Sequence, residues 1–169
     1  MELKRYIRDV PDYPVKGVSF KDITTLLSNP DQFSKALDLM QACIHKSTDV
    51  LASIESRGFI FGSALSDRLK LPNILLRKRG KLPPPVIQKK YELEYGTDYI
   101  EAGTSTLPSK KKIMLVDDLI ATGGSANACE ELLTENGNFV IGVTVLIKLE
   151  YLTPESLFRK PIYSVINYD

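Results

Sequence analysis

The stretch from Ile113 to Ala126, IMLVDDLIATGGSA, indicates both the fold class of this chain and a place where a ligand binds. An apolar run ends in two adjacent carboxylates, Asp117 and Asp118, and a short loop then leads into a segment with helical spacing. The loop consists of Ala121, Thr122, Gly123, Gly124 and Ser125. Amides of a glycine-rich loop at a helix N-terminus bind anions, so this loop fits a phosphate monoester. The two carboxylates are acceptors suited to neighbouring sugar hydroxyls.

A plain strand-turn-helix bend is the alternative interpretation, because two glycines alone often do no more than make the turn. Paired acids together with hydroxyl side chains favour the ligand site. The chain contains neither the GxxxxGK motif of a P-loop nor the GxGxxG motif of dinucleotide-binding proteins. A nucleoside triphosphate site is therefore disfavoured.

Outward from this stretch, short apolar segments alternate with segments of helical spacing. Strands are expected at residues 49–54, 73–77, 112–118 and 139–149. Helices are expected at the start of the chain and at residues 31–46, 59–70 and 125–136. This alternation is typical of the doubly wound α/β class, in which a mostly parallel sheet is covered by helices on both faces and ligands bind beyond the carboxyl ends of strands. Residues 88–95 and the neighbourhood of Tyr99 predict an antiparallel excursion, a flap.

Composition limits the classes of function. With 169 residues, of which 43% are hydrophobic and 25% charged, one compact domain over residues 1–169 is expected. The formal net charge of +1 gives no general electrostatic case for a nucleic-acid or membrane partner. No apolar run approaches the roughly 20 residues of a membrane span, and the charged start has no apolar leader segment, so we expect a cytoplasmic protein.

Histidine and cysteine usage excludes several kinds of site. His45 is the only histidine, which removes His-based zinc sites and a Ser-His-Asp triad from consideration. Cys43 and Cys129 belong to no CxxC pair or ligand cluster, and we expect both to be reduced thiols of the core.

Two further segments carry local positive charge. Leu76 to Lys90 holds six cations and no acid, which suits a ligand of several negative charges such as pyrophosphate. A solvated basic face or a nucleic-acid surface is the alternative, but aromatic residues are not interleaved with these cations. The tetrad Glu55-Ser56-Arg57-Gly58 lies between an expected strand and an expected helix, where Arg57 could meet the same anion or serve as an exposed helix cap. The GxxxG spacing of GFIFG, which follows, predicts close packing.

Five motifs in this order extend the argument to the whole chain: GVSFKDIT, ESRGFIFG, RKRGKLP, YELEYGTD and VDDLIATGGSA. The last motif resembles the phosphoribosyl pyrophosphate signature of type I phosphoribosyltransferases. Together, the five are similar to adenine phosphoribosyltransferases over nearly the full length. The resemblance implies transfer of the phosphoribosyl group from phosphoribosyl pyrophosphate to adenine, which gives AMP and pyrophosphate. It also implies the type I fold, with a small N-terminal hood at residues 1–30 and a flexible flap at residues 81–104.

The resemblance also assigns site residues. Glu94 and Arg57 are the expected catalytic residues, with Glu94 as the acid/base. The phosphate loop and the ribose-binding acids are those described above. The adenine site is expected to comprise Ser19, Phe20, Lys21 and Leu149. The pyrophosphate site is expected to comprise Ser56, Arg57, Arg77, Lys78, Lys81 and Tyr95.

Partners and alternatives follow from the same resemblance. Mg²⁺ is expected to arrive with phosphoribosyl pyrophosphate, without dedicated protein ligands, and the enzyme is expected to be a homodimer. Lys148 stands where the family commonly has an acid, and Pro83 to Pro85 replaces a shorter step, so base preference and flap hinging are open. A related enzyme for xanthine or hypoxanthine and a non-catalytic regulator that senses phosphoribosyl pyrophosphate are the alternatives.

Overall fold

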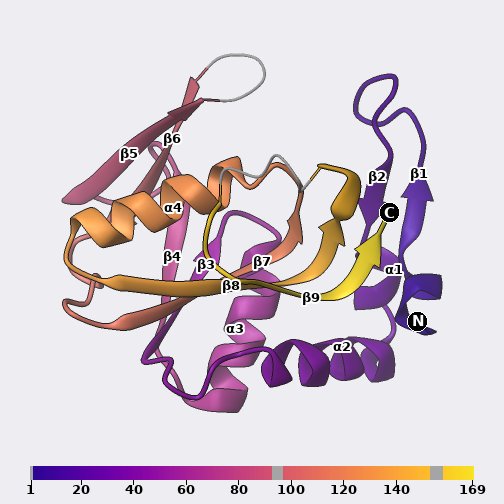
Figure 1. The fold of residues 1–169 in the computed structure, drawn as a ribbon, viewed down its shortest axis with the longest axis horizontal. Coiled ribbons are helices and arrows are strands. Elements are labelled where there is room, and N and C mark those ends of the chain that lie inside the picture. The colour runs from indigo at the N-terminus through magenta and orange to yellow at the C-terminus, as the bar shows by residue number, and fades with distance from the viewer. Residues whose placement is uncertain (1, 93–96, 153–157) are drawn as a thin grey trace.

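The computed structural model describes residues 2–92, 97–152 and 158–169. Its centre is a seven-stranded sheet in the order β5-β6-β4-β3-β7-β8-β9 (Figure 1). The strands are β3 (Val50–Ile54), β4 (Asn73–Lys78), β5 (Val86–Glu92), β6 (Thr97–Gly103), β7 (Lys112–Ile120), β8 (Phe139–Leu149) and β9 (Ile162–Tyr168). The helices are η1 (Glu2–Tyr6), α1 (Thr24–Leu27), α2 (Pro30–Ala42), α3 (Gly58–Leu69), α4 (Gly124–Glu135) and η2 (Glu150–Leu152).

The pairing of the strands confirms the expected fold class. β4, β3, β7, β8 and β9 run parallel in the sheet, while β5 and β6 pair antiparallel with each other and β6 pairs antiparallel with β4. The antiparallel pair is the expected flap excursion. β9 was not expected from the sequence, and it adds a parallel edge beside β8, with Leu149 opposite Tyr168.

Strand β7 illustrates why the central strands read as unbroken apolar runs. Successive side chains point to opposite faces of a strand. Ile113 and Leu115 belong to one buried cluster, with residues of α4, while Met114 and Val116 belong to a second, with residues of α2 and α3. Figure 1 shows α4 on one side of the sheet and α2 and α3 on the other. Both faces are thus covered, and no polar alternation remains in the sequence.

Local signals fix the ends of the helices. Asn29 caps α2 by accepting a hydrogen bond from the Gln32 amide at 3.2 Å, and Pro30 occupies the first turn, where its missing N–H costs nothing. Gly123 immediately precedes α4 with a φ of +75°, and Gly137 follows its end with a φ of +79°. Both angles lie in the left-handed region, which glycine adopts without strain.

The N-terminal residues form a separate small layer beside the sheet, at the end where β9 lies (Figure 1). The helix expected at the start of the chain is the short 3₁₀ helix η1, which precedes an antiparallel pair of strands, β1 (Arg8–Val10) and β2 (Phe20–Asp22). Asp22 stabilises this arrangement because it accepts from the Arg8 guanidinium at 2.8 Å and from the Thr24 amide at 2.8 Å. In the described part of the chain, no helix is long and apolar enough to cross a membrane.

Candidate active site

The glycine-rich loop lies beyond the carboxyl end of β7, as the sequence predicts. β7 ends at Ile120, residues 121–123 turn, and α4 begins at Gly124. The first intrahelical bond runs from the Asn127 amide to the Gly123 carbonyl at 2.8 Å. The preceding amides of the first turn have no partner within the helix, so they are available to an anion. A Cβ on Gly124 would meet no atom within 4 Å, so the approach to this turn is open.

The acid pair lies at the carboxyl end of the same strand. Asp118 is buried and Asp117 is partly exposed, and Oδ1 of Asp117 accepts the Asp118 amide at 2.8 Å. Burial raises the pKa of Asp117 well above its ordinary value, and the neighbouring charge of Asp118 raises it further. Burial also raises the pKa of Asp118, although the Arg57 guanidinium opposes this effect. Two acids that differ in exposure and charge partner thus stand beside the phosphate loop.

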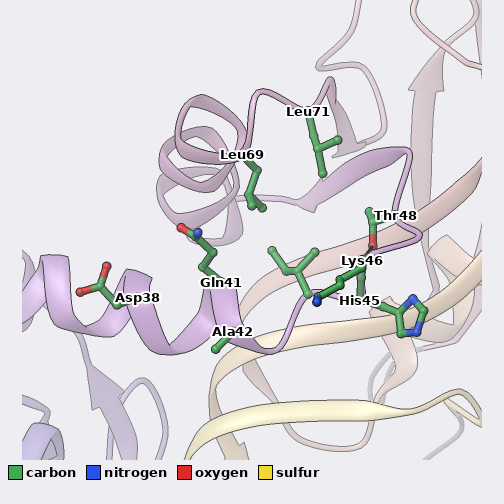
Figure 2. Close-up of a pocket in the computed structure, with 9 residues that line it drawn as sticks. Asp38, Gln41, Ala42, His45, Lys46, Thr48, Leu69 and Leu71 are labelled. Atoms are coloured by element: carbon green, nitrogen blue, oxygen red, sulfur yellow. Dashed lines mark hydrogen bonds between the residues drawn. The ribbon is translucent and has the colours of Figure 1, made fainter.

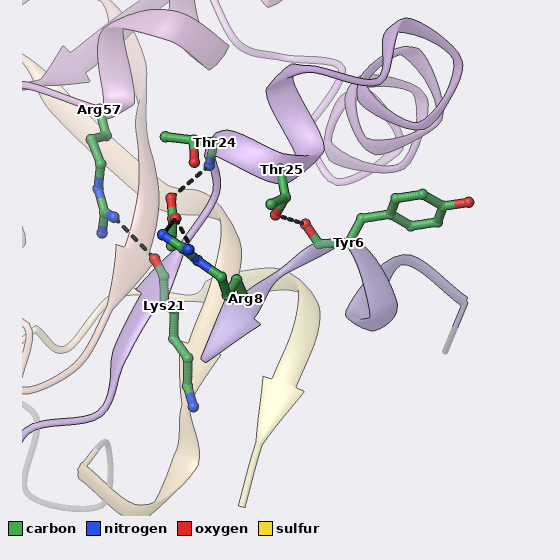
Figure 3. A network of polar contacts seen from close by, with 7 residues as sticks. Tyr6, Arg8, Lys21, Thr24, Thr25 and Arg57 are labelled. Carbon is green, nitrogen blue, oxygen red and sulfur yellow. Dashed lines mark hydrogen bonds and ion pairs between the residues drawn. The ribbon is translucent and has the colours of Figure 1, made fainter. Parts of the chain in front are cut away.

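Arg57 connects the acid pair to the N-terminal layer. Its Nη2 lies 2.8 Å from Oδ2 of Asp118, and its Nη1 donates to the carbonyl oxygen of Lys21 at 3.1 Å. Figure 3 shows the second contact, in which the arginine reaches across to the strand that carries Lys21. Its Cζ also lies 4.9 Å from the centre of the Phe20 ring. One guanidinium therefore contacts residues expected at the ribose site and residues expected at the adenine site.

Close backbone packing keeps Arg57 near the acid pair. Gly58 is the first residue of α3, and a Cβ on it would lie 2.8 Å from the carbonyl oxygen of Val116 and 2.9 Å from Oδ1 of Asp117. Only glycine leaves this space free. The start of GFIFG is packed as its spacing predicts, and the packing presses the ESRG turn against β7.

The expected adenine residues lie at the ends of two different layers. Phe20 is partly exposed in β2, with the Tyr13 ring edge-on at 5.2 Å between ring centroids. Leu149 is buried at the end of β8. The Lys21 side chain is also buried, and its Nζ lies 2.6 Å from Asp9 Oδ1 and 3.3 Å from the Ser19 hydroxyl.

The expected pyrophosphate cations are held by acids that the sequence reasoning did not identify. Glu55 accepts from Arg77 Nε at 3.2 Å and from the Lys78 amide at 2.8 Å. Asp98 lies 3.4 Å from Lys78 Nζ. Arg77 also donates to the Lys81 carbonyl at 2.9 Å, which ties the turn after β4 to the strand. The position of Glu55, directly before Ser56 and Arg57, was the one available signal.

The flap contributes a further residue that sequence reasoning missed. Tyr91 in β5 packs against the core cluster of α4, and its phenol is near enough to the side chains of Ser125 and Asp98 for both to affect its pKa. Burial raises the pKa of Tyr91. Two positions away, Lys89 pairs with Glu131 at 2.9 Å and with Glu135. The flap strand is thus fastened along α4 as far as the phosphate loop. The predicted residues Glu94 and Tyr95 lie outside the described residues.

One cavity lies away from all of these residues. It has a volume of about 460 Å³ and lies around the ends of α2 and α3 (Figure 2). Its lining consists of Asp38, Gln41, Ala42, Ile44, His45, Lys46, Thr48, Leu69 and Leu71. None of these is an expected site residue, so the site rests on the grouping of side chains around Arg57. Among residues 2–92, 97–152 and 158–169, no three His, Cys, Asp or Glu side chains are grouped to hold a metal ion.

Comparison with known proteins covers nearly the whole chain. Residues 22–166 match the family described as "Phosphoribosyl transferase domain", a match that begins just after the expected base residues Ser19, Phe20 and Lys21. The adenine phosphoribosyltransferase of Pseudothermotoga lettingae is 42% identical over 99% of this chain and 100% of its own. That alignment therefore includes the N-terminal layer.

Solved structures agree with the architecture. The adenine phosphoribosyltransferase of Thermoanaerobacter pseudethanolicus has a TM-score of 0.94 and 36% identity, over 99% of this chain and 98% of that one. The enzyme of Saccharomyces cerevisiae, in complex with an imino-altritol bisphosphate and adenine, has a TM-score of 0.89 and 33% identity, over 96% of both chains.

Proposed function

This chain belongs to the adenine phosphoribosyltransferase family, and we propose that the residues grouped around Arg57 are where it transfers the phosphoribosyl group of phosphoribosyl pyrophosphate to adenine. The observation that carries this proposal is the position of Arg57, which contacts Asp118 at 2.8 Å and the Lys21 carbonyl at 3.1 Å. The sugar side and the base side of the reaction meet at this one residue.

Each part of the group has a physical task in the transfer. The 5-phosphate binds the loop from Ala121 to Ser125, where amides of the first turn of α4 and two hydroxyls donate to it. Asp117 and Asp118 accept from the ribose hydroxyls. Loss of pyrophosphate leaves positive charge on the ribose ring, and nearby carboxylates stabilise that charge. Their raised pKa values reflect burial, and a bound cationic transition state would offset it.

The leaving pyrophosphate is held by the cations at the end of β4 and in the turn after it. Arg77, Lys78 and Lys81, together with Ser56 and Arg57, line the turns at the carboxyl ends of β3 and β4. Glu55 and Asp98 hold Arg77 and Lys78 in place before the anion binds, so little ordering is left for the binding step.

Mg²⁺ would enter with the substrate. Asp118 is engaged by Arg57 and Asp117 by a backbone amide, which leaves free lone pairs beside the ribose hydroxyls but no closed cage. This donor set fits a hard cation that keeps several waters and binds mainly through substrate phosphates. Bound there, the metal would draw negative charge from the leaving pyrophosphate.

Adenine would lie against Phe20, with backbone groups of Ser19 and Lys21 at its edge and Leu149 as an apolar wall. Glu94 would move the proton of the purine ring, with Tyr95 closing the pyrophosphate side. Residues 1–30 would then serve as the hood and residues 81–104 as the flap of one domain over residues 1–169. Glu94 and Tyr95 lie outside the described residues, so their roles rest on the resemblance alone.

A homodimer is also proposed. Ile60 on α3 and Leu75 on β4 are large apolar side chains with 39% and 38% exposure, on elements next to the ESRG turn. A second copy placed over them would bury apolar surface that water otherwise contacts. Sedimentation at several concentrations of the protein would test this.

The cytoplasmic location stays a prediction, which cell fractionation would test.

The reaction is tested by supplying phosphoribosyl pyrophosphate and Mg²⁺ with adenine, hypoxanthine, guanine or xanthine, and by following nucleotide formation. We expect AMP from adenine and no nucleotide from the other bases. Turnover of hypoxanthine or xanthine in place of adenine would contradict the base assignment. Binding of phosphoribosyl pyrophosphate without turnover of any base would instead favour the regulator.

Two arginines at opposite ends of α3 test the site. Arg57→Met removes the guanidinium at the centre of the group and should lower kcat/KM by roughly 10- to 100-fold, the cost of one lost charged hydrogen bond of 1.5–3 kcal/mol. Arg68→Met is the matched control, because Arg68 is in the last turn of α3, where its guanidinium pairs with Asp38 and donates to the Ser34 hydroxyl, away from the expected site residues. An equal loss of kcat/KM in both variants would contradict the placement of Arg57 in the active site.

A further inference from the structure

The end of β9 lies against the base side of the candidate site. Tyr168 is opposite Leu149 in the parallel pairing of β9 with β8, and its side chain is only 9% exposed. Leu149 is the proposed apolar wall of the adenine site. The Tyr168 ring is therefore the next side chain along the sheet from that wall, although β9 carries none of the motifs of the family resemblance.

Tyr168 also contacts the segment that carries the other base residues. Lys21 Nζ lies 4.1 Å from the centre of the Tyr168 ring, and the Lys21 side chain is 7% exposed. An ammonium group with so little access to water needs compensating contacts. Asp9 at 2.6 Å, the Ser19 hydroxyl at 3.3 Å and the face of the Tyr168 ring supply them.

The backbone of Lys21 is held at the same time from the other direction. Its carbonyl accepts the hydrogen bond of Arg57, while its side chain reaches Asp9 and Tyr168. Figure 3 shows the Lys21 side chain leading away from Arg57. The segment 19–21 is thus fixed between the catalytic arginine and the last strand of the sheet.

We propose that Tyr168 is a positioning residue of the base site, which sets the affinity for adenine by holding Lys21, and with it Ser19 and Phe20, at a fixed distance from Leu149. The inference rests on the proposed base site. Tyr168 does not touch the base; it acts through Lys21. It leaves the phosphate loop and the pyrophosphate cations unaffected, because these lie at the ends of β3, β4 and β7.

The ionisation state of the phenol is consistent with this contact. Burial, together with the charge of Asp9, raises the pKa of Tyr168 to about 12. The phenol therefore stays neutral across the pH range in which the enzyme would be assayed, and the lysine meets the ring face rather than a phenolate.

A second lysine on the same ring provides a matched control. Lys4 Nζ lies 4.2 Å from the ring centre, but Lys4 is exposed and belongs to η1, outside the base segment. Lys21→Met and Lys4→Met each remove one cation from the ring. If positioning of the base segment is what matters, only the first should change the response to adenine.

The experiment measures steady-state KM and kcat for both substrates in five variants, one of which is Phe20→Leu. We expect Tyr168→Leu and Lys21→Met to raise KM for adenine about 5- to 20-fold, the effect of losing a desolvated cation–π contact, with KM for phosphoribosyl pyrophosphate changed less than about twofold. Tyr168→Phe keeps the ring face and should restore most of the adenine affinity. Lys4→Met should leave both KM values near those of the wild type.

Three results would overturn the inference. The first is an unchanged KM for adenine in Tyr168→Leu and Lys21→Met, and the second is an equal rise of both KM values, which would mean a structural role. The third is a Lys4→Met effect as large as that of Lys21→Met. Phe20→Leu distinguishes the proposed adenine site from the positioning role of Tyr168. If only Phe20→Leu raises KM for adenine, the adenine site is supported and the role of Tyr168 is overturned. If no variant changes KM for adenine, both are overturned. Should Tyr168→Leu fail to fold, the lysine pair still decides.

Discussion

At the scale of single residues, two adjacent carboxylates with little access to water, Asp117 and Asp118, are costly to the folded state. Burial and the charge of Asp118 raise the pKa of Asp117 well above the ordinary value of 3.8. The folded state therefore binds more protons than the unfolded state over the interval between these two pKa values. Stability falls as pH rises through that interval, because the slope follows the difference in bound protons.

This cost leads to a prediction for Asp117→Asn. Without substrate, the variant should be more stable than the wild type at pH 7, because it removes the charge that burial disfavours. A gain of about 1 kcal/mol would raise Tm by roughly 2–4 °C for a chain of this size. The gain should shrink as pH falls through the interval between the two pKa values, because the wild-type carboxyl binds its proton there, and activity should fall throughout. Thermal unfolding between pH 4 and pH 8 measures it, and a difference independent of pH would contradict the assignment.

At the scale of elements, glycines set the distance between α3 and the sheet. A Cβ on Gly62 would lie 1.7 Å from the Ser53 hydroxyl oxygen and 2.9 Å from Ser53 Cβ, too close for either atom. The Ser53 hydroxyl donates to Asn73 Oδ1 at 2.7 Å, so it cannot turn away without losing that bond. The second glycine of GFIFG is required by packing, as its spacing predicts.

Gly62→Ala should therefore destabilise the protein by about 1–3 kcal/mol, the usual cost of overpacking a core. Urea unfolding measures the loss. Adding Ser53→Ala to this variant removes the hydroxyl oxygen of residue 53 but keeps its Cβ. We therefore expect the double variant to recover part of the lost stability. Full stability in Gly62→Ala alone would mean that α3 can move away from β3 at little cost.

The flap is joined to the phosphate helix by two side chains of one face of β5. The Tyr91 phenol lies near the Ser125 side chain, and Lys89 pairs with Glu131 and Glu135. Tyr91→Phe should raise KM for phosphoribosyl pyrophosphate about 3- to 10-fold, since it removes the phenol hydroxyl beside Ser125 of the phosphate loop, and a polar contact of this kind is worth about 1 kcal/mol. Lys89→Met is the control, because its ion pairs are near the surface and such pairs contribute little. An increase for adenine instead of phosphoribosyl pyrophosphate would contradict this connection.

The sequence predicted these elements unevenly, for physical reasons. Strands buried on both faces, such as β3 and β7, appear in the sequence as apolar runs. The loop between β7 and α4 is recognisable from its glycines and hydroxyl residues. β9 was missed because IYSVINY shows neither the unbroken apolar run of a central strand nor a regular alternation: Ser164 and Asn167 interrupt the run, and the buried Val165 and Ile166 are adjacent. β1 and β2 were missed because three-residue strands that pair across a loop carry no periodicity.

The same contrast holds for the candidate site. The residues proposed to meet a ligand are predicted from motifs, whereas those that hold them in place are not. Glu55, Asp98, Tyr91 and Tyr168 act through contacts between segments far apart in the sequence, and a single sequence contains no record of such contacts. Arg57 was expected at the pyrophosphate, and the contact with the Lys21 carbonyl could not have been derived without the arrangement of the N-terminal layer.

At the scale of the whole molecule, the net charge says little about the charge around the candidate site. The chain carries 22 basic and 21 acidic residues, so its net charge of +1 would attract no anion over long distances. Acids elsewhere balance the cations of the turns after β3 and β4. Attraction of phosphoribosyl pyrophosphate therefore depends on a local potential at the carboxyl ends of the strands, which acts over a distance set by the screening length of the solution.

A last prediction follows from this separation. The Debye length falls from about 10 Å in 0.1 M salt to about 3 Å in 1 M salt, so added potassium chloride should weaken binding of the anionic substrate. We expect KM for phosphoribosyl pyrophosphate to rise several-fold, and KM for adenine, which is uncharged, to change less than about twofold over roughly the same range. Lys81→Met should reduce the slope, because Lys81 is an exposed cation of the proposed pyrophosphate site. Lys46→Met, an exposed cation at the ends of α2 and α3, should leave the slope unchanged. If both variants reduced it equally, attraction would come from the molecule's overall charge, and the local cradle of cations after β4 would not be what captures the substrate.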